Sequence, residues 1–193
     1  MSDRFSRFFA AADDEPRVTL LEALDRFEAE GRAPGVAVDL GAGTGRDTAE
    51  LLRRGWSVIA IDAHPDAIAR LAALDGDVRA VQARFDEAEW PDVDLVNSSF
   101  SLPFADPAAF ARTWEHVVAS LRPGGRFCGQ LYGDHDEWAS RAPGDMTFQT
   151  RAGVEQLLEG FEVERLDEFD EDGQTAIGEP KHWHLFHVVA RRP

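Results

Sequence analysis

The stretch from Val36 to Thr48 reads VAVDLGAGTGRDT, and it decides the fold. An apolar run that ends at Asp39 passes through three alternating glycines into a helical pattern, which predicts a strand, a tight loop and a helix start. Glycine has no Cβ and tolerates a positive φ, so the loop can turn beneath a ligand and present its N–H groups. The first N–H groups of the next helix add partial positive charge. We therefore expect a cofactor to bind at this loop.

The glycine spacing argues against a dinucleotide. The dinucleotide fingerprint is G-x-G-x-x-G, whereas this loop reads G-x-G-x-G and has Arg46 where the last glycine would stand. That glycine permits close packing of the helix beneath a pyrophosphate. A nucleoside that carries an amino acid in place of the pyrophosphate suits this loop better.

Two further marks follow the glycine loop. The apolar run Val58–Ile61 ends in Asp62, about twenty residues beyond the glycines, where a carboxylate that binds ribose is expected. The segment Leu121–Phe127 then supplies a helix stop and a turn. With these marks in order, the chain resembles the class I S-adenosylmethionine-dependent methyltransferases. Residues 46–48, 97–104 and 181–184 look most similar to tellurite-resistance-like and other small-molecule members.

The resemblance implies an α/β fold with a doubly wound, seven-stranded, mostly parallel sheet whose last strand is antiparallel, in a Rossmann-like arrangement. One compact domain is expected, with an N-terminal helical arm or lid over residues 1–35 and the S-adenosylmethionine-binding domain over residues 36–193. A helix over residues 18–30 serves equally well as a lid or as plain packing. Strands are expected at residues 36–39, 58–61, 78–83, 93–97, 125–132, 161–169 and 183–190, with an acidic connection over residues 170–173.

The resemblance also implies a set of residues around S-adenosylmethionine. They are Asp39, Gly41, Ala42, Gly43, Gly45, Arg46, Asp62, Ala63, Arg84, Phe85, Asn97 and Ser98. Family members often have an acidic residue after the third strand to hold the adenine amino group, but this chain has Arg84 and Phe85 there. Asp86 or Glu87 could take that role, or Phe85 could pack on the adenine face.

In the family, the seventh strand lies between the fifth and sixth, so residues 181–184 should reach the end of the fifth strand. We expect the substrate pocket to include Phe100, Gln130, Asp134 and Lys181, and the catalytic residues to be His182, His184, His135 and Tyr132. An imidazole with a pKa near 6.5 suits the removal of a proton from a nucleophile. A metal at these histidines is the competing interpretation. Methyl transfer from a sulfonium needs no metal, and none is predicted.

Composition limits the partners. The 193-residue chain has a formal net charge of −16, which would repel a nucleic-acid backbone, so a small-molecule substrate is expected. No leader or membrane-spanning run is evident, which predicts a cytoplasmic protein without membrane contact, as a monomer or homodimer. The single cysteine, Cys128, is expected to be a buried thiol. The alternative function is a non-catalytic protein that binds the cofactor or a partner on the same scaffold.

Overall fold

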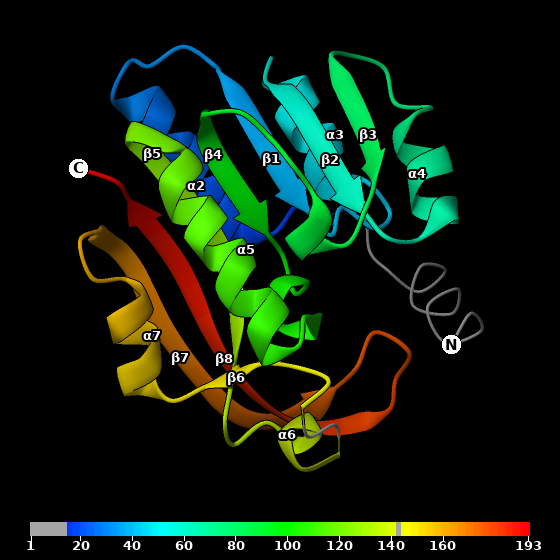
Figure 1. Cartoon of the computed structure of the whole chain (residues 1–193), viewed down its shortest axis with the longest axis vertical. Coiled ribbons are helices and arrows are strands. Elements are labelled where there is room, and N and C mark those ends of the chain that lie inside the picture. The colour runs from blue at the N-terminus through cyan, green and yellow to red at the C-terminus, as the bar shows by residue number, and fades with distance from the viewer. Residues whose placement is uncertain (1–14, 142–143) are drawn as a thin grey trace.

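A twisted sheet with helices on both faces makes up the molecule (Figure 1). The computed structural model describes residues 15–141 and 144–193. Along the sheet the order is β3-β2-β1-β4-β5-β8-β7, and β8 runs antiparallel to both β5 and β7 while the other pairs are parallel. The predicted fold class is confirmed, and so is the predicted position of the last strand between the two strands that precede it, here β5 and β7. The strands are β1 Val36–Leu40, β2 Ser57–Asp62, β3 Val78–Gln82, β4 Val93–Ser98, β5 Leu121–Gly133, β7 Glu162–Gln174 and β8 Pro180–Arg191.

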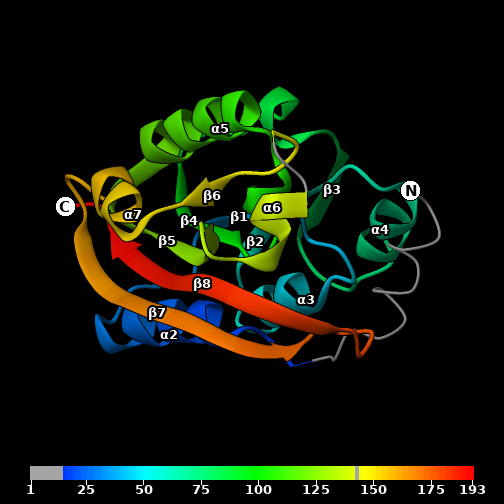
Figure 2. The ribbon, with the colours of Figure 1, turned by 90° about the horizontal axis from the view of Figure 1, so that it is seen from below.

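A short eighth strand, β6 Phe148–Gln149, pairs in parallel with the end of β5, off the main path. The helices are α2 Val18–Ala29, α3 Arg46–Arg53, α4 Pro65–Leu71, α5 Pro107–Ser120, α6 Glu137–Arg141 and α7 Arg151–Leu157, with 3-10 turns η1 Phe85–Glu87 and η2 Leu102–Phe104. Figure 2 shows α5 and α7 on one side of the sheet and α2 and α3 on the other. None of the helices in the described ranges is long and apolar enough to cross a membrane.

Two apolar clusters fill the space between the sheet and its helices. On one face, strand residues such as Val38 and Val96 pack with Phe110 and Trp114 of α5. On the other face, α2 packs through a buried stripe onto the sheet and α3, and Leu20, Leu24 and Phe27 are at most 2% exposed. In the expected arm over residues 1–35, α2 is thus part of the layered core. Residues 1–14, with Phe5, Phe8 and Phe9, lie outside the described residues.

Side-chain caps fix three helix starts that the sequence predicts. The carboxylate of Asp106 accepts hydrogen bonds from the N–H groups of Ala108 and Ala109 at the start of α5. Thr150 accepts one from Gly153 at the start of α7, and His64 accepts one from Asp66 at the start of α4. Each cap satisfies an N–H that has no partner inside the helix. The α5 cap begins the helix directly after the loop that follows β4.

The acidic segment 170–173, expected as a connection, is instead part of β7, and the expectation was wrong. Asp170 and Asp172 stand opposite His184 and His182 of β8. Carboxylates are unfavourable in most strands. Here both Asp170 and Asp172 lie within hydrogen-bond distance of the His182 ring, and the strand pairing continues. The connection is only residues 175–179, where Thr175 and Glu179 bond to each other. The hairpin therefore extends farther than the sequence suggests.

Candidate cofactor and active site

The glycine loop between β1 and α3 needs its glycines. Gly41, Gly43 and Gly45 have φ values of 72°, 55° and 86°, a region that side chains with a Cβ rarely adopt. The N–H of Gly43 donates to Asp62 at 2.9 Å, and the N–H of His64 donates to the other carboxylate oxygen at 2.8 Å. Since a carboxylate has about four acceptor positions, Asp62 can still accept hydrogen bonds from a ribose diol.

A buried polar network lies beneath this loop. Asn97 is 0% exposed, and its amide donates to Asp39 at 2.9 Å and to Asp47 at 3.1 Å. The hydroxyl of Thr48 donates to Asp39 at 2.6 Å. Burial, and then the negative charge of Asp47, raise the pKa of Asp39 to about 7. These side chains join the start of α3 to β1 and β4.

The side chains of Asp39, Asn97 and Ser98, which the sequence places around the cofactor, form hydrogen bonds within the protein, and their contact with a cofactor stays a prediction. Asp39 and Asn97 form hydrogen bonds in the network under the loop. Ser98 is 0% exposed, and its hydroxyl lies 2.8 Å from that of Ser101. Ser101 in turn donates to the carbonyl of Leu40 at the end of β1. Asn97 thus finds its acceptors 58 and 50 residues away, whereas Ser98 bonds to a residue three positions farther on.

The adenine side offers a ring and an acceptor. Phe85 is half-buried, and its ring atom Cζ lies 3.3 Å from the point that a Cβ on Gly41 would occupy. Asp86 accepts a hydrogen bond from Arg112 at 2.6 Å through Oδ2. Its Oδ1 is buried and has no hydrogen-bond partner among the described residues, with Nε of Arg84 at 3.4 Å. Which of these residues would hold an adenine stays a prediction.

Three histidines meet where the topology predicts, at the end of β5. The N–H of His135 donates to Nδ1 of His184 at 3.0 Å, and Nε2 of His184 lies 3.0 Å from Glu168. His182 faces Asp172 at 2.8 Å with Nδ1 and Asp170 at 2.7 Å with Nε2.

Hydrogen bonds to these carboxylates raise the pKa of His182, and a hydrogen bond to Asp170 raises the pKa of His135. For His182 or His184 to accept a proton from a substrate, the ring would first have to break a hydrogen bond to one of its present partners. Their role as catalytic bases stays a prediction.

A metal could also be considered at this cluster. Ligand atoms of Asp134, His135 and His184 lie within 4.8 Å of one another. The Nδ1 lone pair of His184, however, already accepts a backbone N–H, and its Nε2 faces Glu168. Hydrogen bonds alone account for the arrangement, and the expectation of no metal stays a prediction.

Lys181, expected in the substrate pocket, is a buried cation in the structure, and its contact with a substrate stays a prediction. It is 3% exposed, with Nζ 2.5 Å from Asp136 and 3.6 Å from the centre of the Trp183 ring. Burial lowers its pKa, which the contact with Asp136 opposes. Tyr132, a second ring near Nζ, is 2% exposed, and burial raises the pKa of its phenol. A cation among rings and a carboxylate fixes the start of β8 to the end of β5.

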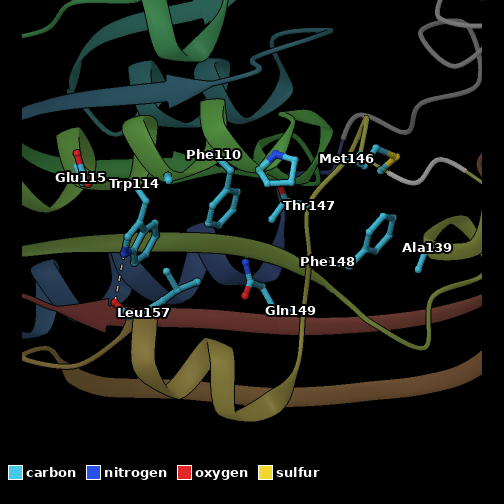
Figure 3. A pocket seen from close by; sticks show the side chains of 12 residues that line it. Phe110, Trp114, Glu115, Ala139, Met146, Thr147, Phe148, Gln149 and Leu157 are labelled. Carbon is cyan, nitrogen blue, oxygen red and sulfur yellow. Dashed lines mark hydrogen bonds between the residues drawn. The ribbon is translucent and has the colours of Figure 1, made fainter.

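Two of the cavities on the described surface bear on the candidate site. The larger, about 710 Å³ and shown in Figure 3, lies between α5, β6 and α7. Phe110, Trp114 and Phe148 line it, and it contains none of the predicted site residues.

The smaller cavity, about 270 Å³, lies beside the end of β4. Its lining is Glu15, Pro16, Arg17, Val18, Phe100, Gln130 and His187. It brings together Phe100 and Gln130, which the sequence predicts for the substrate pocket, with His187, which it misses. The register pairs Gln130 directly with His187 across β5 and β8. That register was the signal that could have revealed His187.

Comparison with known proteins agrees with this geometry. Residues 37–125 match the family described as "Methyltransferase domain". An uncharacterized methyltransferase of Mycobacterium tuberculosis is 36% identical over 102 residues, which are 52% of this chain and 40% of that protein. The chain thus spans 40% of the length of these curated relatives.

Two solved structures share the architecture. The 1,6-didemethyltoxoflavin-N1-methyltransferase of Burkholderia thailandensis, crystallised with 1,6-didemethyltoxoflavin and S-adenosylhomocysteine, is 25% identical and superposes with a TM-score of 0.67 over 99% of this chain and 86% of its own. TehB of Haemophilus influenzae, at 15% identity, superposes with a TM-score of 0.74 over 89% of this chain and 62% of its own. Residues 37–125 thus match a methyltransferase domain, and the fold of the chain is the one that these solved methyltransferase structures share.

Proposed function

We propose that this protein transfers a methyl group from S-adenosylmethionine to a small-molecule acceptor. The observation that carries the proposal is the glycine loop bonded to Asp62, with the ring of Phe85 beside it. Asp62 and Phe85 suit a nucleoside, and the backbone N–H groups of the glycine loop suit the amino-acid group of the cofactor. The Burkholderia relative, crystallised with S-adenosylhomocysteine and a small molecule, supports the same assignment.

Each residue has a task in this proposal. Asp62 accepts hydrogen bonds from the ribose hydroxyls, and Phe85 and Asp86 hold the adenine. The loop and the positive end of α3 face the carboxylate of the amino-acid group. The cofactor supplies an electrophilic methyl group on a sulfonium, whose leaving group is already in place. The protein then has to align the nucleophile and exclude water.

The acceptor lies in the cavity that Phe100 and Gln130 line. Phe100 follows the end of β4, and Gln130 belongs to β5. In open α/β sheets, ligands bind beyond the carboxyl ends of the strands where the strand order reverses, and here that point lies between β1 and β4. A proton leaves the acceptor with the transfer. We keep His135, His182 and His184 as a collective hypothesis for the base, beside the alternative that alignment alone suffices.

Transfer can be tested without knowing the acceptor. The protein is incubated with methyl-labelled S-adenosylmethionine and a small-molecule extract, and products are followed by mass spectrometry. We expect one or a few small molecules to gain the label and S-adenosylhomocysteine to accumulate. Cofactor binding without any labelled product in extracts from several sources would favour the non-catalytic alternative.

A further inference from the structure

The smaller cavity contains a strained residue. Phe100 has φ of 54°, which is unusual for a side chain other than glycine and costs on the order of 1–3 kcal/mol unless its surroundings hold it. Its N–H donates to Oε1 of Gln130 at 3.2 Å. Its ring lies 5.0 Å from the guanidinium of Arg17 and edge-on to Tyr132, with ring centres 6.4 Å apart. Gln130 therefore holds Phe100 in place as a wall of the cavity.

This contact also fixes the orientation of the Gln130 amide. Gln130 is 0% exposed, and because Oε1 accepts from Phe100, the NH₂ group must face the opposite way. Nε2 donates to the hydroxyl of Thr19 at 2.9 Å and lies 3.4 Å from Nδ1 of His187. Because the Nε2 group of Gln130 is a donor, it can bond to His187 only if Nδ1 of that ring carries a lone pair. A neutral imidazole with its lone pair on Nδ1 carries its proton on Nε2.

The charges around His187 agree with a neutral ring. Burial lowers its pKa first, and the positive charges of Arg165 and Arg17 lower it further, while Asp167 opposes them. The ring therefore keeps its neutral form at pH 7 and presents one N–H, at Nε2. Since Nδ1 faces Gln130, Nε2 is the polar ring atom left for a ligand in the cavity that His187 lines.

Resting on the proposed methyl transfer, we propose that this cavity selects a small, flat acceptor that carries a carboxylate or carbonyl oxygen, which accepts a hydrogen bond from Nε2–H of His187. The volume of about 270 Å³ falls just below the usual 300–1,000 Å³ of ligand pockets, so the acceptor is small. The ring of Phe100 provides a face for a planar group. Arg17, whose guanidinium lies over the ring of Phe100, and Glu15 line the same cavity.

Nitrogen-15 NMR of the histidine rings tests the first step directly. In the full-length protein, His187 should carry its proton on Nε2 at pH 7. In Gln130→Leu, which loses the donor to Nδ1, the same ring should become a mixture of tautomers. A proton on Nδ1 in the unchanged protein would overturn the proposal.

Fragment binding tests the second step. Benzoate and nicotinate are compared with aniline and aminopyridine, which match them in shape but present N–H donors. We expect the carboxylates to shift the His187 resonances and to bind about tenfold or more tightly than the amines. That preference should vanish in His187→Phe and partly return in His187→Asn, which keeps an N–H donor.

No preference in the unchanged protein, or an equal preference in His187→Phe, would contradict the proposal. Binding of S-adenosylhomocysteine is measured in the same samples by calorimetry. Because fragment binding requires no transfer, failure of the cofactor to bind is recognised separately from failure of the cavity assignment.

Discussion

Replacing Arg126 by leucine is expected to lower the free energy of unfolding by about 3 kcal/mol. The arginine is 0% exposed, and Nε and Nη2 each lie 2.8 Å from a different oxygen of Glu164. Nη1 donates to Glu30 at 3.2 Å, and the guanidinium lies 4.5 Å from the centre of the Phe27 ring. Its loss leaves Glu164 with only the more distant Arg26, at 3.7 Å, and Glu30 with Arg191, at 4.0 Å. We expect the lower end of the range for a broken buried pair because Glu30 is 36% exposed.

Urea denaturation of matched variants checks this value. Arg151→Leu also removes an arginine from a carboxylate, but this side chain is 45% exposed and its pair with Glu155 should contribute only about 0–1 kcal/mol. The double variant Arg126→Leu/Glu164→Leu should regain part of the loss, since it removes one of the stranded charges. Equal losses in Arg126→Leu and Arg151→Leu would show that Arg126 does not hold α2, β5 and β7 together as described.

Gly41→Ala is expected to destabilise the protein by about 2–5 kcal/mol, because two costs add. The first is the left-handed backbone at φ of 72°. The second is steric, since a Cβ at this position would lie 2.3 Å from Cβ of Ser101. Ser101 cannot move freely, because its hydroxyl is bonded to Leu40 and Ser98. The loop would shift, so the variant should also lose cofactor affinity.

Gly160→Ala is the matched control. Gly160 has φ of 84°, but nothing lies within 4 Å of its would-be Cβ, so it should show only the backbone cost of about 1–2 kcal/mol. Thermal or urea unfolding gives the difference between the two variants. Equal losses would mean that the close approach of Ser101 to the loop is not a real constraint.

The sequence predicted the sheet and the glycine loop because their signals are local. The run at Val36 and the glycines lie next to each other, and the caps at Asp106 and Thr150 act within three residues. The order of the last strands followed from the family resemblance, and the structure confirms it.

What the sequence does not reveal are partners far apart in the chain. It does not show that Asn97 donates to Asp39 and Asp47, which lie 58 and 50 residues away. The acidic segment 170–173 looked like a loop, wrongly, because its pairing with β8 cannot be seen from composition. Nothing in the sequence reveals that Asp136 and Trp183 enclose Lys181. The same limit hid His187, whose importance depends on its position opposite Gln130.

Isothermal calorimetry of cofactor binding tests the central claim most directly. The account predicts saturable binding of S-adenosylmethionine and S-adenosylhomocysteine, no binding of NAD, and affinity at least about tenfold lower in Asp62→Ala, which loses charge-assisted hydrogen bonds to the ribose. Asp66→Ala, which removes an exposed carboxylate from the first turn of α4, should bind like the unchanged protein. Binding of NAD, or unchanged affinity for S-adenosylhomocysteine in Asp62→Ala, would contradict the assignment of the glycine loop and Asp62 as the cofactor site.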